Sequence, residues 1–94
     1  MFVVTVVFEV EREEADAFLT RVQQQARDSL ENEIGCHRFD VSVCTKHRER
    51  ILLYELYDDA DAFAVHLASD HFANFDREVS PITRSKKIES WSLA

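Results

Sequence analysis

The sequence predicts a single α+β domain with the element order β-α-β-β-α-β, in which helices cover one face of a four-stranded antiparallel sheet. Apolar residues alternate over residues 2–10, recur at helical spacing over residues 15–30, and return in both patterns in the second half of the chain. The chain has 94 residues, of which 46% are hydrophobic, enough for one core. We therefore expect one domain spanning residues 1–94.

The first half of the chain contains one strand and one long helix. In the strand 2–10 the even positions are apolar, and Val3 and Val7 make the opposite face apolar as well, so both faces need cover. An amphipathic helix of about five turns follows from Glu13 and ends near Gly35, the only glycine. We expect Gly35 to supply left-handed or turn geometry at the corner. The apolar stripe of the helix consists of Ala15, Phe18, Leu19, Val22, Ala26 and Leu30.

The second half contains two strands, a split helix and a last strand. Residues 36–45 form a strand with Phe39, Val41 and Val43 on one face, and after a polar loop the strand 51–57 is apolar or aromatic except for Glu55. Asp58 or Asp59 caps a helix, which breaks at Ser69-Asp70 before a second helical piece. The last strand covers residues 82–93.

This order is the ferredoxin-like arrangement, which leaves one face of its sheet open. Because the first and third strands carry apolar residues on both faces, a single chain would expose a patch of aliphatic and aromatic side chains to water. A symmetric partner would cover that patch. We therefore expect a homodimer.

Charge and hydropathy exclude several classes of protein. The chain carries 18 Asp and Glu against 11 Lys and Arg, a net charge of -7, whereas nucleic-acid binding depends on neutralising phosphates. The first residues alternate and form neither a basic region nor an apolar run of spanning length, so we expect a cytoplasmic protein without a membrane segment. Cys36 and Cys44 lie too far apart along one strand for a disulfide, so we expect free thiols.

His66 is the first candidate for chemistry. It follows Phe63 by three residues, so its imidazole could face the sheet and act as a general base, or it could pack as a core-boundary histidine. His71 lies five positions later, about 140° around a continuous helix, so the two side chains converge only if the helix breaks between them. The same rotation argues against a zinc pair at i, i+4 spacing, and we expect no metal site.

The other candidates lie mainly on the strands. Glu55 and Asp40 could orient a histidine or accept a proton if burial raised their pKa values, or they could form ion pairs, for example with Arg38. Tyr54 or Arg38 could stabilise an oxyanion, although Tyr54 also fits an ordinary core position. The candidate catalytic residues are therefore His66, His71, Glu55 and Asp40, and the candidate substrate-binding residues are Tyr54, Arg38, Phe39, Phe63, Phe72 and Trp91.

Four short motifs occur in order between Glu33 and Phe75. They are the corner Glu33-Ile34-Gly35-Cys36, the segment Arg38-Phe39-Asp40-Val41, the run Leu53-Tyr54-Glu55-Leu56-Tyr57-Asp58-Asp59, and His66 followed by Ser69-Asp70-His71-Phe72. Together they resemble the antibiotic biosynthesis monooxygenase (ABM) domain, although that family usually has proline where this chain has Ile34. The resemblance implies a dimeric α+β barrel with a pocket between helices and sheet in each subunit.

The resemblance also implies a function. It leads us to expect a monooxygenase that needs neither metal nor flavin and acts on a small hydroquinone or polyphenol. One branch of the family instead isomerises a phosphorylated autoinducer-2-type hydroxydione, where Arg84 and Lys87 would hold the phosphate; a dimeric ligand-binding domain without catalysis is the third alternative. In all three the partner is a small aromatic or carbonyl molecule. From the residues alone, Arg84, Lys86 and Lys87 are better interpreted as a solvated strand face.

Overall fold

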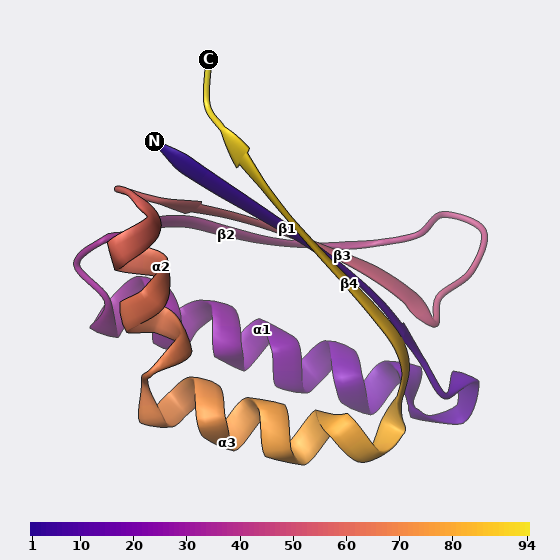
Figure 1. Ribbon diagram of the computed structural model, residues 1–94. Coiled ribbons are helices and arrows are strands. Elements are labelled where there is room, and N and C mark those ends of the chain that lie inside the picture. The colour runs from indigo at the N-terminus through magenta and orange to yellow at the C-terminus, as the bar shows by residue number, and fades with distance from the viewer.

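The computed structural model describes residues 1–94, and its elements follow the predicted order (Figure 1). Short 3-10 turns at residues 12–14 and 80–82 flank the main elements. The ferredoxin-like α+β fold is thereby confirmed. The elements are β1 (Phe2–Val10), α1 (Ala15–Asn32), β2 (Cys36–Val43), β3 (Arg50–Tyr57), α2 (Ala60–Leu67), α3 (Asp70–Val79) and β4 (Thr83–Ser92).

The four strands form one antiparallel sheet in the order β2-β3-β1-β4. In its register Val6 lies opposite Leu53 of β3 on one side and Ile88 of β4 on the other. All three helices lie on the same face of the sheet, and no element covers the other face (Figure 1). Because β4 is an edge strand, its residues are the least enclosed part of the sheet.

The core fills the space between the helices and the covered face of the sheet. It takes the even positions of β1 and the odd positions of β3, as the period of two along a strand requires. From α1 it takes Ala15, Phe18, Val22 and Ala26 of the predicted stripe, whereas Leu30 is 45% exposed. Two polar residues of α1, Gln25 and Ser29, are fully buried beside this stripe.

The uncovered face, here called the open face, carries the odd positions of β1 and their neighbours. Leu52 is 40% exposed and Trp91 is 50% exposed, with the Trp91 indole N–H donating to Thr5 Oγ1 over 2.9 Å. Tyr54 and Leu56 are half-buried there. The predicted apolar patch is therefore present on the single chain.

The corner between α1 and β2 confirms the predicted turn at Gly35 and excludes the left-handed alternative. Gly35 does not adopt a left-handed conformation, since no glycine in the chain has a positive φ. A Cβ atom at Gly35 would instead lie 2.6 Å from the Cβ of Ala62. Glycine is therefore required at this corner because α2 packs directly against the backbone.

The predicted helix break at Ser69-Asp70 is present. Ser69 is the N-cap of α3, where its hydroxyl accepts a hydrogen bond from the Phe72 N–H over 3.2 Å and donates to the His66 carbonyl over 2.7 Å. Asp59 caps α2 by accepting from the Ala62 N–H over 2.8 Å. Since α2 and α3 then run in different directions, side chains of the two helices can approach one another (Figure 1).

Both cysteines are free thiols, as predicted. Burial raises the pKa of Cys36 to about 12, which keeps this thiol protonated and a poor nucleophile. None of the helices combines the length and apolar character that crossing a membrane requires.

Candidate active site

A small cavity lies between the covered face of the sheet and the helices. Its volume is about 30 Å³, room for one or two water molecules. Nine of its thirteen lining residues are hydrophobic, so a polar group in it faces little competition from solvent. Its four polar lining residues come from four different elements: Gln25 from α1, Glu55 from β3, His66 from α2 and Lys86 from β4.

His66 is held by a buried hydrogen bond to Glu33. It is 3% exposed, and its Nδ1 lies 2.9 Å from Glu33 Oε2 and 3.4 Å from Ser29 Oγ. Because a carboxylate oxygen accepts hydrogen bonds, this contact places the imidazole proton on Nδ1. Nε2 is then free to accept a proton, and it lies 4.0 Å from Glu55 Oε1.

The protonation state of His66 follows from the same surroundings. Burial lowers the pKa of His66, and the hydrogen bond and charge of Glu33 oppose that effect without cancelling it. His66 is thus a neutral imidazole at neutral pH. Glu33, at the C-cap of α1 and 7% exposed, would stabilise the cation that forms when Nε2 accepts a proton.

His71 reaches the same carboxylate from α3. Its Nε2 lies 2.9 Å from Glu33 Oε2, within ion-pair distance although the N–H is not aligned for a hydrogen bond. Its Nδ1 lies 3.1 Å from Gln25 Nε2. The ring centroids of His66 and His71 are 6.0 Å apart, so the helix break brings the two histidines together as predicted. His71 lies behind the cavity and does not line it.

Glu55 is a buried acid on β3. It is 3% exposed and accepts a hydrogen bond of 2.5 Å from the Tyr57 hydroxyl. Burial raises the pKa of Glu55 to about 7, although the Tyr57 hydrogen bond acts in the opposite direction. Burial and the neighbouring Glu55 raise the pKa of Tyr57 above its usual range, so Tyr57 keeps its proton. Glu55 can therefore donate or accept a proton near neutral pH.

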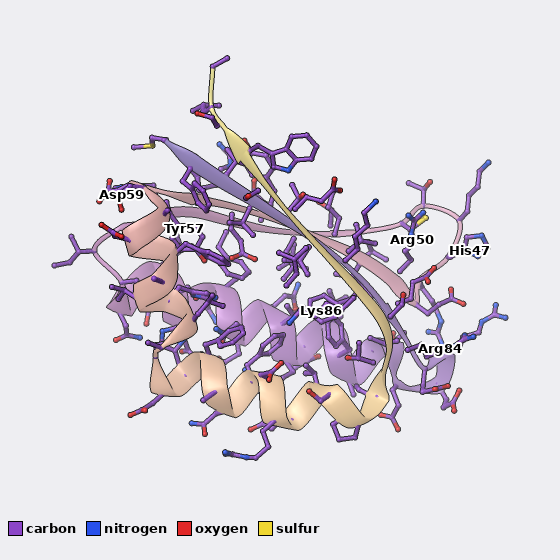
Figure 2. The ribbon with its side chains drawn as sticks, in the orientation of Figure 1. His47, Arg50, Tyr57, Asp59, Arg84 and Lys86 are labelled. Carbon is purple, nitrogen blue, oxygen red and sulfur yellow. The ribbon has the colours of Figure 1, made fainter.

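Lys86 supplies a positive charge at the cavity. Figure 2 shows its side chain extending from β4 into the space between sheet and helices. Its Nζ lies 3.8 Å from Asp76 Oδ1, and 5.3 Å and 5.7 Å from the ring centroids of Phe8 and Phe72. Lys86 is still an exposed residue of β4, as a solvated strand face predicts, but its side chain is only 28% exposed, against 74% for Lys87 on the open face.

The sheet divides the ten predicted site residues into two groups. On the covered side the structure brings together His66, His71, Glu55, Phe39, Phe63 and Phe72, and all of these except His71 line the cavity. On the open face lie Asp40, Arg38, Tyr54 and Trp91, since the register pairs them with one another or with other residues of that face. Those four residues cannot touch a ligand in the cavity of their own chain.

The residues on the open face have other partners. The Arg38 guanidinium donates to Asp40 Oδ2 over 2.6 Å, and both side chains are exposed. This is the ion pair that the sequence left open as an alternative for Asp40. Arg84 is exposed, and Lys87 lies 3.8 Å from Glu89 on the open face, so neither phosphate contact expected for an isomerase is at the cavity.

Sequence reasoning missed five residues of the site: Gln25, Ser29, Glu33, Tyr57 and Lys86. A signal existed for three of them. Residues 25, 29 and 33 recur every four positions, which forms a polar row on the buried side of α1 next to the apolar stripe. No group of three or more His, Cys, Asp or Glu side chains is arranged to hold a metal ion.

Solved structures similar to this chain share its fold. An antibiotic biosynthesis monooxygenase superposes with a TM-score of 0.92 and 19% sequence identity, covering 100% of this chain and 99% of its own. A structure named "Putative antibiotic biosynthesis monooxygenase from Nitrosomonas europaea" has a TM-score of 0.94 and 23% identity, covering 99% and 98%. No curated protein sequence matches the chain.

The family assignment comes from the sequence. The family model described as "Antibiotic biosynthesis monooxygenase" matches residues 1–78. That range runs from β1 into the last turn of α3, with His66, His71 and the buried Glu33 and Glu55, and it omits β4 with Lys86. The chain belongs to the antibiotic biosynthesis monooxygenase family.

Proposed function

We propose that this protein is a monooxygenase that oxidises a small hydroquinone-type phenol in the cavity beside His66. The observation that carries the proposal is the Glu33–His66 pair, which leaves Nε2 of a buried neutral imidazole free to accept a proton in an apolar cavity. Membership of the family supports the reaction class. A phenol of this kind becomes easily oxidised once a base has removed its proton.

The first step is proton transfer. His66 Nε2 accepts the phenolic proton, and Glu33 stabilises the resulting imidazolium through Nδ1–H. Lys86 stabilises the phenolate oxygen by its positive charge, the role that we first expected of Tyr54 or Arg38. The hydrophobic walls exclude water from the anion.

The second step is oxidation by dioxygen. One oxygen atom forms a new bond to a ring carbon, and the other leaves as water with two hydrogens taken from the substrate. The product is a hydroxyquinone, and the substrate supplies all the electrons that dioxygen accepts, so no other reductant is needed. Glu55, with a pKa of about 7, delivers a proton to the departing oxygen.

A ligand of this size requires the cavity to open. The closed volume of about 30 Å³ is far below that of a typical ligand pocket. Two lining side chains, Leu67 and Ile88, are 45% and 51% exposed, so they can rotate outward without disturbing the core. We propose that they form the entrance.

Oxygen consumption by metal-free protein with a panel of hydroquinones tests the proposal. We expect protein-dependent uptake, reduced about 10²- to 10⁴-fold in His66→Ala because the base is lost. The matched control is His37→Ala, since His37 is an exposed histidine paired with Asp58 far from the cavity lining. Uptake that His66→Ala leaves intact would contradict the proposal. Turnover of a phosphorylated hydroxydione without uptake would point to the isomerase instead.

We also propose that the protein is a homodimer that pairs through the open face. The support is the half-exposed apolar set on that face, with Leu52 and Trp91 at its two ends. Pairing would remove this surface from water and leave the cavities on the outer, helix-covered sides.

A further inference from the structure

We propose that Gln25 is a substrate-recognition residue whose amide oxygen accepts a hydrogen bond from a second hydroxyl group of the ligand. The inference rests on the proposed function, in which the cavity is the substrate site, and it assigns the residue that recognises the second hydroxyl group of the substrate. The ligand is a small ring that carries at least two hydroxyl groups, one for His66 and one for Gln25.

The first argument is an unpaired atom. Gln25 lies on α1, is 0% exposed and lines the cavity. Its Oε1 is buried and has no hydrogen-bond partner. An unpaired buried amide oxygen destabilises the folded chain, a cost that an apolar side chain at this position would avoid. The free acceptor is therefore explained by a donor that arrives with a ligand.

The second argument is that the amide is held in one orientation. An amide nitrogen can only donate a hydrogen bond, and Gln25 Nε2 has His71 as its partner. His71 Nδ1 is then an acceptor, and it takes a hydrogen bond from Gln25 Nε2 over 3.1 Å. The amide oxygen then has no protein partner and can accept a hydrogen bond from a ligand in the cavity. His71 is thus a positioning residue, since it acts on the ligand through Gln25.

The third argument concerns the location of the two polar ends. Gln25 comes from α1, whereas His66 and Glu55 come from α2 and β3, so the polar groups reach the cavity from three elements. The remaining lining, apart from Lys86, is hydrophobic. A flat ring with hydroxyl groups on two sides satisfies both ends, whereas a single-hydroxyl ligand leaves Gln25 Oε1 unpaired.

The test compares two probes that differ in one donor. Hydroquinone carries two hydroxyl groups, and 4-methoxyphenol has one of them replaced by a methyl ether that cannot donate. Binding is measured by calorimetry without oxygen, so that no turnover occurs. We expect the wild-type chain to bind hydroquinone about tenfold or more tightly than 4-methoxyphenol. Gln25→Met, which keeps the length of the side chain and removes the acceptor, should lose that preference.

A matched control uses the same substitution one residue earlier. Gln24 is on the exposed side of α1, where its amide donates to Asp28, so Gln24→Met should keep the preference. If Gln25→Met keeps the preference for hydroquinone, the inference is overturned, because the amide oxygen would then accept a hydrogen bond from water and not from the ligand. Failure of the wild-type chain to bind either probe would overturn it as well.

A second measurement covers the case in which Gln25→Met does not fold. In the wild-type chain, the side-chain amide NMR signals of Gln25 should shift on addition of hydroquinone and stay in place with 4-methoxyphenol. Equal shifts with both probes would contradict the inference. Binding is measured without oxygen, so it is independent of turnover. If Gln25→Met loses the preference for hydroquinone but the wild-type chain consumes no oxygen, Gln25 is still a recognition residue and the oxygenase proposal is rejected.

Discussion

The two faces of the sheet are built from alternate residues of the same four strands, yet they differ in kind. The covered face buries an ionisable network, with Glu55 and His66 each 3% exposed. The open face carries an exposed ion pair, Arg38–Asp40, beside apolar side chains such as Leu52 that remain 40% exposed. Ionisable groups are thus buried on the covered face, while apolar groups meet water on the open face.

Both features, buried ionisable side chains and exposed apolar side chains, are unfavourable for the stability of a single chain. Burying carboxylates and imidazoles costs free energy unless they pair, and the covered face pairs them in a chain from Gln25 to Glu33 and His66. Arrangements of this kind mark functional sites. The open face has no such network, and its exposed apolar area is explained by association. The following substitutions test the two assignments.

The largest expected effect is on the covered face. Glu33→Gln keeps the shape of the side chain but no longer fixes the His66 proton on Nδ1, so kcat/KM for oxygen uptake should fall about a thousandfold. Since Glu33 raises the pKa of His66, the activity profile should also shift to lower pH, an effect that a purely structural role would not produce. Glu31→Gln, an exposed carboxylate on the same helix, is the control. Equal kinetics in both variants would remove Glu33 from the site.

The next effect is the pH dependence of stability that Glu55 causes. Its pKa rises from 4.5 in the unfolded chain to about 7 in the folded one, so the folded state holds the proton more tightly. The resulting stabilisation is complete below pH 4.5 and is lost as the pH rises through 7, by about 3 kcal/mol in total. Urea unfolding across this range should show that loss in the wild type but not in Glu55→Gln. Glu89→Gln on the open face should behave like the wild type, and a Glu55→Gln curve parallel to the wild type would contradict the prediction.

Substitutions on the open face should weaken dimerisation and leave oxygen uptake unchanged. Leu52→Lys places a charge in the proposed interface twice, once from each subunit, and should weaken dimerisation by about 2 kcal/mol, roughly thirtyfold. Light scattering over a micromolar concentration series measures this. Val65→Lys, a substitution of a 62% exposed residue on α2, should leave the mass unchanged. A wild-type chain that is monomeric throughout would refute the dimer.

The smallest effect is at the corner that closes the covered face. Gly35→Ala introduces a Cβ only 2.6 Å from that of Ala62, and the resulting overpacking should lower the free energy of unfolding by about 1–2 kcal/mol. The double variant with Ala62→Gly removes the opposing Cβ and should recover most of the loss. Urea denaturation compares the three chains. Absence of recovery would contradict the steric explanation for Gly35.

The sequence could have excluded part of the predicted site without a structure. Tyr54 and Glu55 are neighbours on one strand, and so are Arg38 and Phe39, so alternation places the members of each pair on opposite faces. Choosing Glu55 and Phe39 for the cavity therefore rules out Tyr54 and Arg38. The proximity of His66 and His71 was harder to predict from the sequence, because it depends on the helix break at Ser69, whose hydroxyl caps α3.

Local periodicity determined the elements of this protein, their order and the two-sided character of β1, because each of these depends on residues close together in the chain. The fold class and the helix break followed from such patterns. The joining of Glu33 to His66 and His71, and the turning of Lys86 toward the cavity, were decided only by the tertiary structure. These contacts join distant segments, and the side chains of Glu33 and His66 are buried only because the surrounding helices and strands enclose them together.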